Sequence, residues 1–105
     1  MVQTKTKKAA KTKTMAYDVA AQLRTPEEMA AYLDAWLDEF PDDAAGIARA
    51  LGDIARAKGM TQVAKEAGLS RESLYRALSV DGNPSFDTVL RVARALGVKL
   101  HAEAA

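Results

Sequence analysis

The polar side chains of residues 70–76 are of the types that bond the bases and phosphates of nucleic acids. Arginine can reach O6 and N7 of guanine with both ends of its guanidinium group, and Arg71 and Arg76 are two such residues. Glu72 can accept from cytosine N4 or simply balance the charge of Arg76, one turn away. The predicted DNA-contacting residues are Thr61, Gln62, Ser70, Arg71, Glu72, Ser73, Tyr75, Arg76 and Asn83.

Two short helices joined by a tight turn must position these side chains. The sequence predicts helices at 61–67 and 70–78, with Thr61 and Ser70 as N-caps, because each hydroxyl can accept a bond from a first-turn N–H. Gly68 stands at the turn, where glycine takes a positive φ without steric cost. This pattern is typical of a helix-turn-helix, whose second helix enters the major groove of DNA. A plain helical hairpin is the alternative. The residues that fit the contact between the helices are Val63, Ala64, Ala67, Leu69, Leu74 and Leu78.

Three more helices are predicted around this pair. Thr25 and Glu28 form a capping box at the start of one helix, and Pro41 ends it. The other two helices are expected between residues 42 and 59 and between residues 85 and 97. Apolar residues recur at helical spacing in all three, which predicts one buried face for each helix.

The ends of the chain differ from this helical pattern. Residues 98–102 alternate apolar and polar, which predicts a short β-strand that must pair with another chain or with residues 17–23. Residues 1–14 hold five lysines and no acid and are predicted to be disordered, either as a phosphate-contacting arm or as a solvated tail. The expected organisation is this tail, a helical segment at 15–41 and a DNA-binding domain at 42–105 that includes the strand.

The composition of the 105 residues argues against several functions. There is no cysteine, which excludes disulfides and a thiol nucleophile and fits a cytoplasmic protein. His101 is the only histidine and no cluster of ligands accompanies it, so we expect no metal and no cofactor. We expect no enzyme activity, because no catalytic constellation is present. No stretch reaches the roughly 18 apolar residues of a membrane helix.

An acidic helix is the candidate surface for a protein partner. The net charge is only +1, but residues 15–57 carry nine acids against three arginines, which suits a cationic partner. Aromatic residues recur every four positions at Tyr32, Trp36 and Phe40. They are explained either by core packing or by a docking face. The predicted partner-binding residues are Tyr32, Asp34, Trp36, Asp38 and Glu39.

Several stretches together resemble one family. They are Gly46–Gly59, Met60–Ser79, Gly82–Phe86, Leu96–Leu100, Tyr17–Ala20 and Arg24–Met29. This combination is similar to the antidote (antitoxin) proteins of HigA-like addiction modules. The resemblance implies an all-α, lambda-repressor-like five-helix domain that forms a homodimer and represses its own operon on double-stranded operator DNA. It also implies a partner toxin of the RelE/ParE superfamily.

One position departs from the pattern of lambda-repressor-like domains. Many of them place a phosphate-binding glutamine four residues before the small alanine of the first motif helix. Here Met60 holds that position relative to Ala64, and Gln62 lies only two residues before it. We therefore expect the first motif helix to begin late. Two alternatives to an antitoxin remain open: a stand-alone phage-type repressor without a toxin, and an interaction module that has lost DNA binding.

Overall fold

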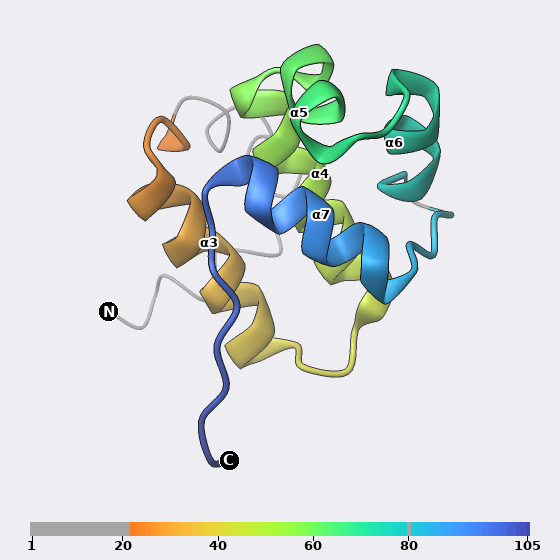
Figure 1. Cartoon of the computed structure of the whole chain (residues 1–105). Coiled ribbons are helices and arrows are strands. Elements are labelled where there is room, and N and C mark those ends of the chain that lie inside the picture. Colours follow the sequence, from red (N-terminus) through yellow and green to blue (C-terminus); the bar gives the residue numbers. More distant parts are fainter. Residues whose placement is uncertain (1–21, 80) are drawn as a thin grey trace.

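The computed structural model describes residues 22–79 and 81–105, and these residues form five helices and no β-strand (Figure 1). The all-helical class is therefore confirmed for the described part of the chain, whereas the predicted tail at 1–14 lies outside it. The helices are α3 (Pro26–Glu39), α4 (Ala44–Lys58), α5 (Met60–Ala67), α6 (Arg71–Ala77) and α7 (Phe86–Leu96).

Four of the five helices begin at a side-chain cap. Thr25 and Glu28 form the predicted capping box of α3, with the Glu28 amide 3.1 Å from the Thr25 hydroxyl and the Thr25 amide 3.0 Å from the Glu28 carboxylate. Asp43, Ser70 and Ser85 accept in the same way from first-turn amides of α4, α6 and α7. These caps satisfy N–H groups that a helix start otherwise leaves unpaired.

The start of α5 corrects two predictions. This helix begins at Met60, directly after Gly59, and no side chain caps it. Thr61 therefore lies inside the first turn rather than before it, and the helix does not begin late. The physical reason is the backbone of Gly59, whose φ of 120° lets the chain end α4 and start α5 within one residue.

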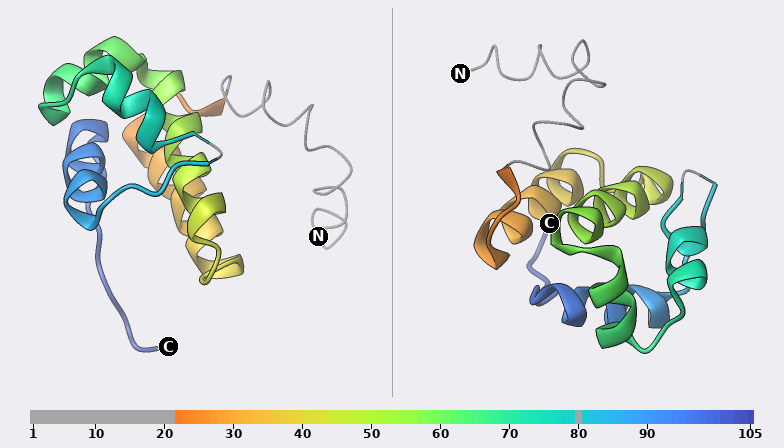
Figure 2. Two further views of the ribbon diagram at one scale, coloured as in Figure 1. Left: turned by 90° about the vertical axis from the view of Figure 1, so that its right-hand side faces the viewer. Right: turned by 90° about the horizontal axis from the view of Figure 1, so that it is seen from above.

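All five helices contribute to one core. Its fully buried large side chains are Leu51, Ile54, Val63, Leu74, Leu78, Val92 and Leu96. α3 lies beside α4, and α5 lies beside α7 (Figure 2). Lys58 ties the second pair to α4, because its ammonium group donates to the Ala95 carbonyl at 2.6 Å and lies 3.5 Å from the Glu66 carboxylate.

The predicted strand at 98–102 is wrong for this chain. Val98 is buried and its amide bonds the Ala93 carbonyl, but the residues after it run away from the helices without a ladder (Figure 1). A strand needs a neighbour for its backbone groups, and the described residues supply none.

The predicted burial of the apolar faces of α3 and α7 is only partly correct. Met29 and Leu33 are buried on α3, and Val92 and Leu96 on α7. The apolar side chains near the end of α3 and the start of α7 are instead exposed; they are Leu37, Phe40, Phe86 and Leu90.

Candidate nucleic-acid interface

The turn between α5 and α6 is built on Gly68. Its φ is 73°, in the left-handed region, and its amide donates to the Lys65 carbonyl at 3.2 Å. The Leu69 amide then donates to the Ala64 carbonyl at 2.9 Å. These bonds satisfy the last carbonyl groups of α5 and end the helix sharply. Only three residues, 68–70, then separate α5 from α6.

Residues with short side chains lie where α6 packs on the core. Leu74 and Leu78 point into the core, and Ala64 and Ala67 of α5 are buried near them. Gly52 of α4 also lies close, since a Cβ atom built on it would be 3.0 Å from the Leu78 carbonyl oxygen. The short helix therefore packs against α5, and its C-cap Leu78 approaches α4 closely, while its outer face stays in solvent.

The outer face of α6 carries the predicted base-contacting side chains. Arg71, Glu72, Tyr75 and Arg76 are all exposed. The Arg71 guanidinium group lies over the Tyr75 ring, 5.4 Å from its centroid, and donates to the Tyr75 hydroxyl at 3.3 Å. This contact restrains both side chains on the solvent side, because a cation over an aromatic face is favourable.

Two of the predicted DNA-contacting hydroxyls already form hydrogen bonds within the first turn of α6. The Ser70 hydroxyl accepts from the Ser73 amide at 3.0 Å and donates to the Ser73 hydroxyl at 2.9 Å. Ser73 is half-buried as a result. Both serines act first as parts of the α6 cap, which fixes the orientation from which Arg71 projects.

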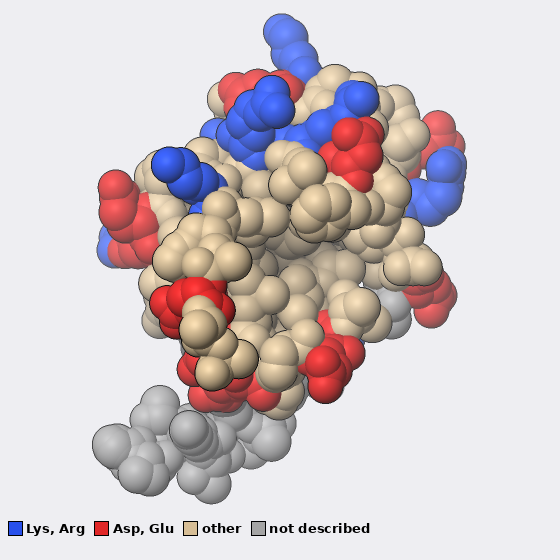
Figure 3. All heavy atoms as spheres, turned by 60° about the horizontal axis from the view of Figure 1, so that its bottom comes forward, with Lys and Arg blue, Asp and Glu red and all other residues tan. Residues whose placement is uncertain are grey.

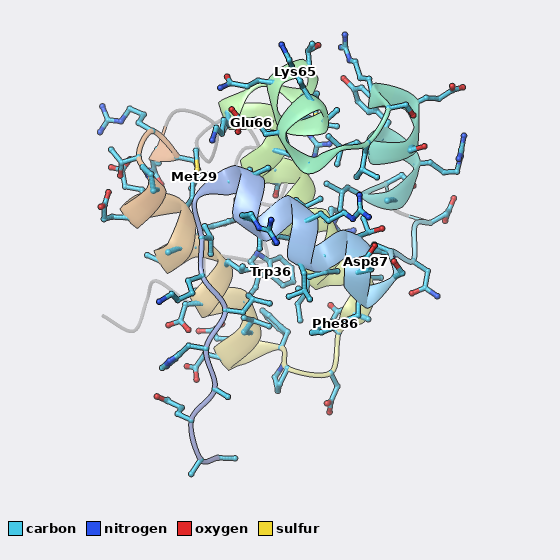
Figure 4. All side chains as sticks on the ribbon, viewed as in Figure 1. Met29, Trp36, Lys65, Glu66, Phe86 and Asp87 are labelled. Carbon is cyan, nitrogen blue, oxygen red and sulfur yellow. The ribbon has the colours of Figure 1, made fainter. Side chains whose placement is uncertain are left out.

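On α5, Thr61 and Gln62 are exposed, and Gln62 donates to the Glu66 carboxylate at 3.0 Å. This bond and the nearby Lys58 ammonium group lower the pKa of Glu66, so the carboxylate stays charged and paired. Figure 4 shows Lys65 and Glu66 at the same end of the molecule, with Glu66 on the side of α5 that faces the start of α3. Asn83 lies apart from this group, in a loop that lines a hollow beside the start of α4.

Arg91 of α7 also lies near the turn, which the sequence did not indicate. An Arg91 guanidinium nitrogen is 3.4 Å from the position that a Cβ atom of Gly68 would take. Arg91 also bonds Asp87, one helical turn earlier, at 3.0 Å. The only signal in the sequence is the place of Arg91 on a predicted helix, because its proximity to the turn depends on α7 packing against α5.

The predicted partner-binding residues of α3 do not all face solvent. The Tyr32 hydroxyl donates to the Asp53 carboxylate of α4 at 2.8 Å, and Arg56 bonds the same carboxylate at 2.9 Å. Burial raises the pKa of Tyr32 to about 12, and the Asp53 bond acts in the same direction. Tyr32 therefore joins α3 to α4.

The other predicted partner-binding residues remain closer to the surface. Trp36 is half-buried, and its ring is 2.7 Å from where a Cβ atom of Gly46 would be. The Trp36 and Phe40 rings have centroids 5.1 Å apart. Asp34, Asp38 and Glu39 are exposed.

Two general features are absent from the described ranges. Residues 22–79 and 81–105 contain no gathered set of three metal-ligand side chains. None of their helices is long and apolar enough to cross a membrane.

These features define a small helical domain with a capped, arginine-bearing helix on one side of its surface and an acidic helix on the other. Residues 13–104 match the family described as "probable addiction module antidote protein", and the chain belongs to this family. Such an antidote is the antitoxin of a toxin–antitoxin module, which implies a toxin as its partner.

A second comparison finds a related protein that is similar over most of the chain. An uncharacterized protein of Haemophilus influenzae (strain ATCC 51907 / DSM 11121 / KW20 / Rd) is 48% identical over 87 residues. The match covers 83% of this chain and 88% of the relative. No solved structure matches the chain.

Proposed function

We propose that this antitoxin represses its own operon by binding operator DNA with α5 and α6. In this proposal the two helices act as a lambda-repressor-like helix-turn-helix of a HigA-like protein, and α6 enters the major groove. The protein forms a homodimer, neutralises a RelE/ParE-type toxin in the cytoplasm and catalyses no reaction.

The observation that carries the DNA-binding proposal is the way α6 is fixed to the domain with its first turn exposed. Recognition helices contact base edges mainly with their N-terminal residues. Ser70 caps α6, Leu74 anchors it in the core, and Arg71 projects from its first turn into solvent. The arginine is thus held on a fixed helix where it can bond guanine in two places.

The length of α6 supports a dimer. Arg71–Ala77 has seven residues, about two helical turns, and contacts only a few base pairs. Two copies related by a two-fold axis read two half-sites, as the symmetry of such operators requires.

The charge distribution supports a basic toxin. Residues 25–48 contain seven acids and no lysine or arginine. Ribonuclease-like toxins act on polyanions, and opposite potentials speed the encounter of two proteins.

The test is binding of the full-length protein to the duplex upstream of its own gene, measured by fluorescence anisotropy. Arg71→Ala should weaken operator binding by about 1–3 kcal/mol, roughly 5- to 150-fold, and relax the preference at one base position. Lys99→Ala is the matched control, since it removes one positive charge from the C-terminal segment. An equal loss for Arg71→Ala on operator and random duplex would show that Arg71 contacts phosphate alone.

Co-purification with the product of the adjacent gene separates the remaining alternatives. A stand-alone repressor binds the operator without such a partner. An interaction module that has lost DNA binding captures the partner but binds no duplex, even at low salt, where phosphate contacts are strongest.

A further inference from the structure

Four large apolar side chains are exposed in the last turn of α3 and the first turns of α7, and a fifth is exposed on the segment after α7. We call them the apolar face; they are Leu37, Phe40, Phe86, Leu90 and Leu100. Phe86 is 70% exposed, although a buried aromatic ring stabilises a fold more than most other side chains do. Figure 4 shows Phe86 at the start of α7 and Trp36 directed from α3 toward α7. An apolar surface of this kind, surrounded by charges, is typical of an interaction site.

A hollow of about 260 Å³ opens within this region. Its apolar walls include Pro41, Ile47, Pro84 and Val89, so it lies between the loop that follows α3 and the first turns of α7. Small-molecule sites usually have about 300–1,000 Å³ and several convergent polar groups. The hollow is smaller and mainly apolar, which suits a side chain of a protein partner better.

The charges around the apolar face decide which partner fits. The seven acids of residues 25–48 include Asp34, Asp38 and Asp42, which are exposed on and after α3. Figure 3 shows acidic groups around the lower part of this side of the molecule and basic groups gathered in its upper part. Asp87, next to Phe86, is paired with Arg91.

This negative rim argues against three other occupants. A second copy docked through the same face would bring the two sets of acids together, and like charges in juxtaposition are costly. Nucleic acid and anionic lipid would be repelled for the same reason.

We propose that the apolar face binds the toxin, a basic protein that places apolar side chains in the hollow and pairs lysines or arginines with the acidic rim. The inference rests on the toxin partner of the proposed function and assigns its docking surface. Figure 1 places α6 and the end of α3 at opposite corners of the domain, so toxin and DNA can be held by one chain at the same time.

The test measures binding of the full-length protein to the purified product of the adjacent gene by biolayer interferometry. Phe86→Ala should weaken the complex at least about tenfold through faster dissociation, as expected for a central aromatic anchor. The melting temperature and the operator affinity of the Phe86→Ala protein should not change, because the Phe86 ring is mostly in solvent. Tyr75→Ala is the matched control, since it removes an exposed aromatic ring from α6 instead and should leave toxin binding intact.

A second variant tests the rim. Reversing Asp34 and Asp38 to lysine should slow toxin association and reduce its dependence on salt, with little effect on dissociation. Together the two variants separate the apolar anchor from electrostatic steering.

Three results would overturn the inference. If the wild type binds the toxin and both variants bind it with the same rates, the toxin docks elsewhere and the proposed function stands. If Phe86→Ala breaks a homodimer in sedimentation but keeps its toxin affinity, a second copy covers the face. If the wild type itself binds no product of the adjacent gene, the proposed toxin partner fails and this docking surface fails with it.

Discussion

Replacing Leu74 by alanine tests whether α6 is fixed to the domain by its buried side chains. Leu74 is fully buried in the middle of the seven-residue helix. A leucine-to-alanine change at such a position costs about 2.7–5.0 kcal/mol, the larger values where the cavity cannot collapse. Ala64 and Ala67 are buried on α5, against which α6 packs, and their side chains are too short to fill the space. We therefore expect a cost in the upper half of that range.

A loss of this size is large for a domain whose total stability is about 5–15 kcal/mol. Each kcal/mol lowers the melting temperature of a 60–100-residue domain by about 4–8 °C, so Leu74→Ala should lower it by more than about 10 °C. The assay is thermal and urea unfolding, followed by far-ultraviolet circular dichroism for all helices and by Trp36 fluorescence for the α3–α4 region.

Tyr75→Ala is the control, because it changes an exposed neighbour on the same helix and should cost less than about 1 kcal/mol. A fall in melting temperature of less than about 4 °C for Leu74→Ala would correspond to under about 1 kcal/mol and refute the anchoring of α6. Loss of helical signal before Trp36 fluorescence changes would instead show that α6 detaches by itself.

Three further substitutions test other parts of the domain. Ala64→Leu should destabilise the fold by about 1–3 kcal/mol in urea unfolding, because the extra carbons enter a closed contact between α5 and its neighbours. Gly68→Ala should cost about 1–2 kcal/mol in the same measurement, since φ is 73° there, and an unchanged midpoint would contradict the turn geometry. Tyr32 ionises near pH 10 when unfolded and near pH 12 when folded, so stability should fall as pH rises between these values. Tyr32→Phe should flatten that fall in pH-dependent unfolding; an identical slope in both proteins would count against the Tyr32–Asp53 bond.

The sequence alone determined most of the helix boundaries, because these depend on neighbouring residues. Thr25 and Ser70 cap the helices that they were predicted to cap, and Gly68 and Gly97 end helices with positive φ. A cap joins a hydroxyl to an amide three residues away, so it can be recognised without knowledge of the fold.

The sequence misplaced features that depend on exact backbone geometry or on a distant neighbour. Thr61 has the right residue type for a cap, but Gly59 takes a conformation that starts α5 one residue earlier. Residues 98–102 alternate like a strand, but a strand forms only beside a partner.

Only the tertiary structure decided which candidate side chains are available to a partner. Helical spacing places Tyr32, Trp36 and Phe40 in one row, yet Tyr32 bonds Asp53 on α4 while Phe40 remains exposed. Phe86 has the spacing of a core residue, but α7 begins beyond the part of the core that could cover it. Spacing fixes the face of a helix on which a residue lies, whereas its burial depends on how far the neighbouring helices extend, and a single helix does not encode that extent.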